Sequence, residues 1–415
     1  MNQVIALDML QSTGIGALAL LLGMFLTRKI AWLQKFCIPS PVSGGMLFSL
    51  ATLALYKIWH IEITFDGTLK DVFMLAFFTS VGFQSNLKVL RQGGKTLVMM
   101  LLLLVFIIVL QNAVPLLITR LLDVNPLIGM AAGSISMAGG HGTAGGFSSV
   151  LEGMGLHGAG TIAMAAATFG LIAGSVIGGP VAERLIRKYL SSEHLEPKDY
   201  EIDPAMAGIE TDEASPAGRA KRISSHELEF QRYASATYSL LIVMALGTIA
   251  SQLLQDTGIT FPTYFGALTM AAIVRNVLEQ TSYAKKLEIE KIVSVGNISL
   301  SLFLGMAMIS LKLWQLQSLA LPLLVILLSQ VILIALLTYF VAFRILGRNY
   351  DAAVLVAGIC GFGLGATPNA MANMSAVCYK YHYSIKPFLI VPIIGAMFVD
   401  LLNTGIITMF LNWIG

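Results

Sequence analysis

Two stretches rich in glycine and polar residues interrupt long apolar sequence. Residues 133–146 read GSISMAGGHGTAGG, and residues 361–373 read GFGLGATPNAMAN. Glycine disfavours a helix by about 1 kcal/mol per residue relative to alanine, so the first stretch predicts a helix that is broken between Gly139 and Gly145. In the second stretch, Pro368 suits the first turn of a new helix, where no backbone N–H is needed. We therefore expect half-helices around each stretch.

The remainder of the chain has the composition of an integral membrane protein. It is 56% hydrophobic and only 12% charged, whereas soluble domains carry about 25% charged residues. Apolar runs such as 319–337 and 389–410 approach the roughly 20 residues that cross a bilayer. Lipid cannot satisfy the backbone groups that a broken helix exposes, so these must face protein, water or a ligand. No basic cluster with interleaved aromatic residues suggests a nucleic-acid partner.

We predict an all-α integral membrane fold with ten spanning helices. Two further segments, 127–157 and 351–378, are expected to be re-entrant hairpins, which enter the membrane and leave on the same side. A polar, acidic stretch at 190–232 is expected to be a flexible cytoplasmic linker. The predicted spans are 5–27, 38–57, 69–86, 96–119, 159–183, 234–255, 262–277, 292–311, 317–343 and 387–412.

The distribution of basic residues supports this layout. With both termini placed in the periplasm, all but four of the 26 Lys and Arg residues fall on the cytoplasmic side, as the positive-inside rule requires. The four exceptions are Lys57, Lys70, Arg120 and Lys312. Full crossing by the hairpins would move the basic residues that follow 183 to the outside and break the bias.

The two halves of the chain also resemble each other. Pro39 in the sequence IPS corresponds to Pro262 in FPT, and Asn125 precedes the first Gly-rich hairpin as Asn349 precedes the second. Since each half has an odd number of spans, the second must be inserted upside down. We therefore predict two inverted-topology repeats, 1–189 and 233–415, which are typical of alternating-access carriers.

The hairpins are the first candidate for a substrate site. Helix N-termini offer free N–H donors and a partial positive charge, which suit a carboxylate. Packing between helices is the alternative use for these residues, with Asn369 and Asn373, four apart on one face, as interhelical glue. The candidates are Ser134, Ser136, Gly140, His141, Gly142, Thr143, Gly365, Thr367, Asn369 and Asn373.

Asp400 is the second candidate, because an ionisable residue within a span suggests function. It would bind a substrate ammonium group or Na⁺, or exchange a proton; Asn403, three residues on, shares its face. Structural pairing with a distant basic residue is the alternative. Hydroxyl and carbonyl oxygens suit Na⁺, and the candidate ligands are Thr168, Asn297, Ser299, Gly363 and Asp400.

Strings in both halves resemble the bacterial sodium/glutamate symporter family, across essentially the whole chain except the central linker. The resemblance implies an inner-membrane importer of L-glutamate driven by Na⁺. It also implies five spans and one hairpin per half, and a homodimer that works by an elevator-type motion. The strings lie at 133–143, 167–171, 177–182, 296–304, 349–354 and 361–368.

Three other functions can be compared with sodium-coupled glutamate transport. A di- or tricarboxylate carrier could use the same parts, but Asp400 would repel a purely anionic substrate unless it binds Na⁺. A cation/proton antiporter would favour paired carboxylates, and only Asp400 is found at the expected depth. An intramembrane metalloprotease would need His-Glu-x-x-His, which does not occur, so we expect no enzyme.

Overall fold

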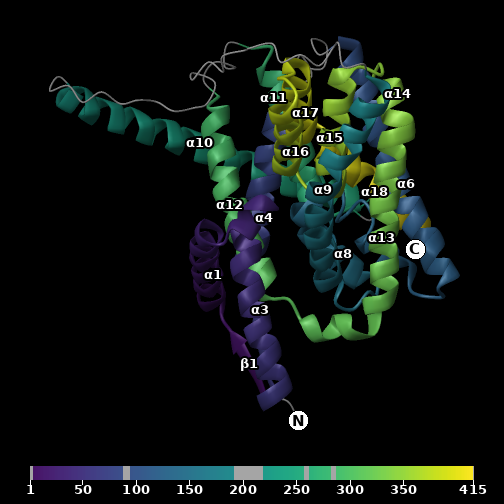
Figure 1. Cartoon of the computed structure of the whole chain (residues 1–415). Helices are drawn as coiled ribbons and strands as arrows, with labels where there is room; N and C mark the ends of the chain where they lie inside the picture. Colours follow the sequence, from purple (N-terminus) through teal and green to yellow (C-terminus); the bar gives the residue numbers. More distant parts are fainter. Residues whose placement is uncertain (1–2, 87–93, 191–217, 257–260, 282–286, 415) are drawn as a thin grey trace.

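The computed structural model describes residues 3–86, 94–190, 218–256, 261–281 and 287–414. It is a helical bundle with one small sheet at the N-terminal end (Figure 1). The principal helices are α1 (Met9–Lys29), α3 (Ser40–Trp59), α4 (Thr68–Gln84), α6 (Gly94–Leu121), α9 (Ala159–Tyr189), α10 (Gly218–Gln255), α11 (Thr263–Leu278), α12 (Ile289–Ile309), α13 (Ala320–Leu337), η5 (Thr338–Ala342), α14 (Phe343–Ile345), α17 (Ile385–Met397) and α18 (Val399–Ile414).

Seven of the described helices are long and apolar enough to cross a membrane, and α17 with α18 makes an eighth if that bent pair is one span. The remaining two predicted spans correspond to α4, with 17 residues, and α11, with 16 residues. Both are shorter than the roughly 20 residues of a straight span. The prediction of a multi-pass helical membrane protein is confirmed, while the count of ten spans remains a prediction.

Three boundaries differ from those expected from the sequence. The last span is bent by 48° between α17 and α18, at Phe398. Helix α10 begins at Gly218, so the end of the predicted 190–232 linker is helical; residues 191–217 lie outside the described part of the chain. Finally, Gln3–Leu7 is strand β1, not the start of the first helix.

Strand β1 makes the all-α prediction wrong in this detail. It pairs in parallel with β2 (Ile61–Phe65), in register from Gln3 opposite Ile61 to Leu7 opposite Phe65. The Asp66 N–H, just after β2, donates to Ser12 Oγ at 2.9 Å. Asp8 then caps α1 through a reciprocal bond with Gln11. The sheet therefore ties the start of α1 to the connection between α3 and α4.

The helices pack as two groups. One group contains α1, α3, α4, α10, α11 and α12, with α4 packed against both α11 and α12. The other contains α6, α9, α13, α17, α18 and the two hairpins, with α9 packed against a helix of each hairpin. Few helix pairs connect the groups, notably the first hairpin with α12 and α17 with α4. Each group draws on both halves of the sequence.

The second hairpin consists of α15 (Tyr350–Leu364) and α16 (Thr367–Lys380). Gly361 faces the backbone of Ala370, and Gly358 faces Met374, so the two helices run antiparallel. Pro368 lies in the first turn of α16, as predicted.

The first hairpin is less regular. It begins with α7 (Pro126–Ala131), continues through turns, and returns as α8 (Gly140–Gly153). The helix break was expected within Gly139–Gly145, but it ends at Gly139. The later glycines lie within helix α8. Close neighbours require their small size there: the Phe303 ring packs against Gly145, and Tyr264 packs against Gly146.

The sequence landmarks of the two halves have matching structural roles. Pro39 is the N-cap of α3 and Pro262 is the N-cap of α11, with nearly identical extended backbone angles. Asn125 caps α7 by accepting a bond from the Leu127 N–H, and Asn349 caps α15 by accepting one from the Ala352 N–H. The correspondence therefore extends from residue type to local geometry.

Candidate functional site

The tips of the two hairpins are in contact. Gly140 has φ of 58°, a left-handed conformation, and a Cβ built there would lie 3.0 Å from the Gly365 carbonyl oxygen. A side chain at Gly140 would therefore be strained and would also push the tips apart. Gly365 itself has φ of −155°, so it does not need the left-handed region. The two tips therefore meet at these glycines.

A cavity of about 380 Å³ opens beside this contact. Its wall includes the first turn of α8, from Gly140 to Gly142, and the start of α16 at Thr367. The first N–H groups of an α-helix have no partner within the helix, and neither α8 nor α16 has a side-chain cap. Helix α8 therefore directs backbone donors at the cavity, whereas the first turn of α16 offers only the Thr367 N–H, because Pro368 has none and the Asn369 N–H donates to the Ala366 carbonyl at 3.0 Å. Both 14-residue helices present the positive ends of their dipoles to this cavity.

Asp400 brings the only carboxylate among the residues that line this cavity. It lies in the first turn of α18, directly after the bend at Phe398. The Thr143 hydroxyl of α8 donates to Asp400 Oδ1 at 3.4 Å. A carboxylate in the first turn of a helix is favoured by the helix dipole. Asp400 therefore lies where hairpin, bent span and cavity meet.

His141 lines the same cavity and is 6% exposed. Its Nε2 is 3.0 Å from Thr168 Oγ1 of α9. The Thr168 hydroxyl already donates to the Met164 carbonyl at 2.9 Å, so it accepts from His141, and Nε2 carries the proton. This bond fixes the orientation of the His141 ring, so Thr168 acts as its hydrogen-bond acceptor.

Two predicted site residues of α16 make hydrogen bonds to α9. Asn369 Nδ2 donates to the Leu171 carbonyl at 2.7 Å, and Asn373 Nδ2 donates to the Gly174 carbonyl at 2.9 Å. Both amides thus attach α16 to α9, as the packing alternative describes. Gly178 leaves the room that the Asn373 amide occupies.

Other predicted residues lie behind the cavity wall. Ser134 donates to Asn112 Oδ1 at 3.0 Å, and its carbonyl accepts a bond from Asn403 Nδ2, also at 3.0 Å. Ser136 donates to the carbonyls of Ala131 and Ala163. These bonds attach the irregular segment between α7 and α8 to the neighbouring helices α6, α9 and α18.

Of the predicted Na⁺ ligands, Asn297 and Asp400 line the cavity. Ser299 donates to the Val295 carbonyl of its own helix, and the Gly363 carbonyl accepts a bond of 2.5 Å from Gln111 Nε2. The structure therefore brings together Gly140, His141, Gly142, Gly365, Thr367, Asn297 and Asp400, with Thr143 and Thr168 in contact with members of that set.

The sequence analysis did not identify all the residues that line the cavity beside the hairpin tips. Pro39, Phe77 and Gln84 line the cavity from the other helix group. Nothing in their spacing marks them, because an aromatic or amide residue on an apolar helix usually packs. It also missed two buried oxygens in the hairpin group: within the described part of the chain, Gln111 Oε1 and Gln330 Oε1 have no hydrogen-bond partner. The same holds for Oδ1 of two predicted residues, Asn369 and Asn403.

A multi-pass helical bundle in which half-helices start at a cavity that also contains a carboxylate is characteristic of membrane transport proteins. The family model described as sodium/glutamate symporter matches residues 5–383. The chain is 43% identical over 408 residues to the sodium/glutamate symporter of Escherichia coli (strain K12), covering 98% of each. It is 38% identical over 399 residues to the sodium/glutamate symporter of Haemophilus influenzae, covering 96% of this chain and 95% of that one. This chain belongs to the sodium/glutamate symporter family.

Among solved structures, the chain resembles the sodium proton antiporter MjNhaP1 from Methanocaldococcus jannaschii, with a TM-score of 0.42 and 18% identity. The likeness covers 98% of this chain and 95% of that chain. It is too distant to indicate a mechanism. Membership of a symporter family confirms that the protein is a transporter and not an enzyme.

Proposed function

We propose that this protein imports L-glutamate together with Na⁺ across the bacterial inner membrane by alternating access. Its family supports the coupling ion and the substrate. The observation that carries the proposal is the joint opening of α8 and α16 onto a cavity that also contains Asp400. Two positive helix ends and one carboxylate complement a molecule with two carboxylates and one ammonium group.

In this proposal the backbone donors at Gly140–Gly142 and near Thr367 hold the substrate carboxylates. His141, fixed by Thr168, contributes a further polar contact at the cavity wall. Asp400 binds the substrate ammonium group, with Thr143 orienting the carboxylate. Asn369, Asn373, Ser134, Ser136 and Asn403 hold the hairpins in place without touching the substrate.

Na⁺ is a hard cation and prefers oxygen ligands, as other hard cations do. Asp400 and Asn297 are its candidate ligands within the cavity. The buried oxygens of Gln111, Gln330 and Asn403 lie in the group of helices that holds the hairpins. An unpartnered buried carbonyl oxygen is costly, and a bound Na⁺ would offset that cost. A scan of Na⁺ dependence across variants at these positions separates the two possibilities.

We also propose that the halves are inverted repeats and that the two helix groups move past one another as in an elevator. The matched caps at Pro39 and Pro262, and at Asn125 and Asn349, support the repeats. The sparse connections between the helix groups support relative motion. The distribution of basic residues supports a periplasmic position for both termini. The homodimer is expected from the family resemblance and is tested by chemical crosslinking in the membrane.

The test is uptake of radiolabelled L-glutamate into proteoliposomes, with a Na⁺ gradient, with a K⁺ gradient of equal size, and with Na⁺ on both sides. Concentrative uptake only with the Na⁺ gradient is the expected result. A carrier of purely anionic dicarboxylates would instead accumulate glutarate in preference to glutamate. Proton-driven Na⁺ efflux without any organic substrate would indicate an antiporter.

A further inference from the structure

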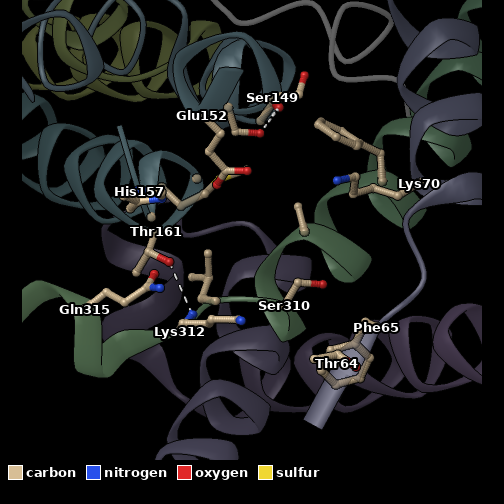
Figure 2. A pocket seen from close by; sticks show the side chains of 18 of the residues that line it. Thr64, Phe65, Lys70, Ser149, Glu152, His157, Thr161, Ser310, Lys312 and Gln315 are labelled. Atoms are coloured by element: carbon tan, nitrogen blue, oxygen red, sulfur yellow. Dashed lines mark hydrogen bonds between the residues drawn. The ribbon is translucent and has the colours of Figure 1, made fainter. Parts of the chain in front are cut away.

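A second cavity, of about 460 Å³, lies at the other end of α8 and α12 (Figure 2). On α8, the residues that line the first cavity are Gly140–Gly142, and those that line the second run from Gly145 to Glu152. On α12 the order is the same, from Asn297 in the first cavity to Ala307 in the second. The two cavities therefore follow one another along the same helix pair.

Phe303 lies at the boundary between the two cavities on α12. It is fully buried and lines the second cavity, and the next residue, Leu304, lines the first. A Cβ placed on Gly145 would collide with its ring and with the Met164 terminal methyl. The ring thus fills a notch that only glycine can provide. The two cavities share no lining residue, so a molecule in the second cavity would lie apart from Asp400 and the hairpin tips.

The second cavity contains charges of both signs. Figure 2 shows Glu152 and Lys70 on opposite sides of the space, each directed into it. Lys70 Nζ is 3.7 Å from Asp71 Oδ1, beyond hydrogen-bond length, and the Asp71 side chain is 61% exposed. Lys70 is therefore available to a ligand.

Lys312 also lines the cavity, but its ammonium group is already paired with a carboxylate. Its Nζ forms an ion pair with Glu62 Oε1 at 2.6 Å, and its N–H donates to the Thr161 hydroxyl at 3.2 Å. His157, Ser148, Ser310 and Gln315 complete a predominantly polar wall. Lys70, Lys312 and strand β2 also belong to the end of the molecule that the positive-inside rule places in the periplasm.

We propose that this second cavity is an external binding site for an acidic amino acid, in which Lys70 binds a carboxylate and Glu152 binds the ammonium group. The inference rests on the proposed glutamate transport and adds a first binding step outside the Phe303 contact. Its volume lies within the range of small-molecule sites. A single lysine opposite a single carboxylate distinguishes an amino acid from a simple dicarboxylate, because only the amino acid can use both.

The experiment compares Lys70→Gln, Glu152→Gln and Lys57→Gln, each in the full chain and normalised to the protein present in the membrane. Lys57 is an exposed lysine of the same predicted side that lines neither cavity, so it is the matched control. Uptake from outside is measured in right-side-out vesicles and from the opposite face in inside-out vesicles. Glutarate, which lacks the ammonium group, is the competitor.

Loss of Lys70 should raise the external KM for glutamate about tenfold, as expected for a charge-assisted hydrogen bond. The maximal rate and the KM in inside-out vesicles should stay within about twofold of the wild type, since one lost bond accounts for the effect. External inhibition by glutarate should weaken equally. Glu152→Gln should raise the KM for glutamate without weakening glutarate, and Lys70→Arg should restore most of the affinity.

The proposal is overturned if Lys70→Gln behaves as Lys57→Gln does, or if its effect is equal from both faces. It is also overturned if Glu152→Gln weakens glutarate as much as glutamate. These failures leave wild-type Na⁺-driven uptake intact. Absence of uptake by the wild type itself would overturn the proposed function and this site together.

Discussion

The Thr143 hydroxyl donates to Asp400 Oδ1 at 3.4 Å, across 257 positions of sequence. This contact joins the first hairpin to the bend in the last span, at the edge of the cavity that both hairpin tips share. It links the one carboxylate of the cavity wall to the element that carries Gly140 and His141.

Asp400→Asn keeps the shape of the side chain and removes its charge. We expect affinity for glutamate in the presence of Na⁺ to fall by about 30-fold or more, by analogy with truncation of one partner of a buried charge pair. Radiolabelled binding to the purified protein measures this. Glu290→Gln, at an exposed carboxylate that lines neither cavity, is the control.

The same variant separates the two roles of Asp400. If the carboxylate holds the ammonium group, Na⁺ binding without substrate survives and glutamate loses its advantage over glutarate. If it holds Na⁺, binding of Na⁺ alone is lost. Unchanged glutamate uptake at low Na⁺ would exclude both roles and leave Asp400 as a structural residue.

Replacement of Gly140 by valine should abolish transport while the protein still inserts. The new Cβ would be forced into a left-handed conformation and against the Gly365 carbonyl. Gly365→Val should also fail, because its Cβ would crowd the Gly361 carbonyl and Leu171 Cα, both at 3.1 Å. Gly179→Ala is the control, since a Cβ there meets nothing within 4 Å. Normal uptake by both valine variants would refute the role of the tip contact.

Asn373→Leu tests whether the amides of α16 are glue or ligands. Its Nδ2 donates to the carbonyls of Gly174 and Ala357, so the variant should destabilise the protein by about 1–2 kcal/mol. A lower midpoint of thermal unfolding in detergent is the readout. The KM for glutamate should stay within about twofold, because the variant loses two buried structural bonds and no substrate contact. A large rise in KM at unchanged stability would instead make Asn373 a ligand.

The orientation of the chain is open to cysteine labelling in a variant that lacks Cys37, Cys360 and Cys378. A cysteine at Lys57 should react with an impermeant thiol reagent in intact cells. One at Arg187, whose side chain is 69% exposed at the other predicted face, should react only after permeabilisation. The reverse pattern would contradict the periplasmic placement of the N-terminus.

Membrane class and half-helices could be predicted because each depends on local composition: apolar length, glycine content, and proline or asparagine at helix starts. Asn369 and Asn373 show the limit of such reasoning. Their spacing gives a common helix face, but only the packing of α16 on α9 decides that this face meets Leu171 and Gly174 instead of the cavity.

The first hairpin and the N-terminus show two other limits. The glycines after Gly139 suggested a break, yet they lie within α8. They are small because the rings of Phe303 and Tyr264 occupy the space that a side chain would fill. Strand β1 was read as helix because its partner, β2, is more than fifty residues away along the chain. Lys70 and Glu152, likewise, look like ordinary surface charges until the fold places them across one cavity.

The Phe303 ring in its Gly145 notch also bears on how the membrane potential would act on the proposed transport. A potential of 100 mV is worth about 2.3 kcal/mol for each elementary charge that crosses the whole bilayer. On the proposed route from the second cavity to the first, a charged substrate or ion passes Phe303. We therefore expect the size of the side chain at this position to influence the voltage dependence of uptake.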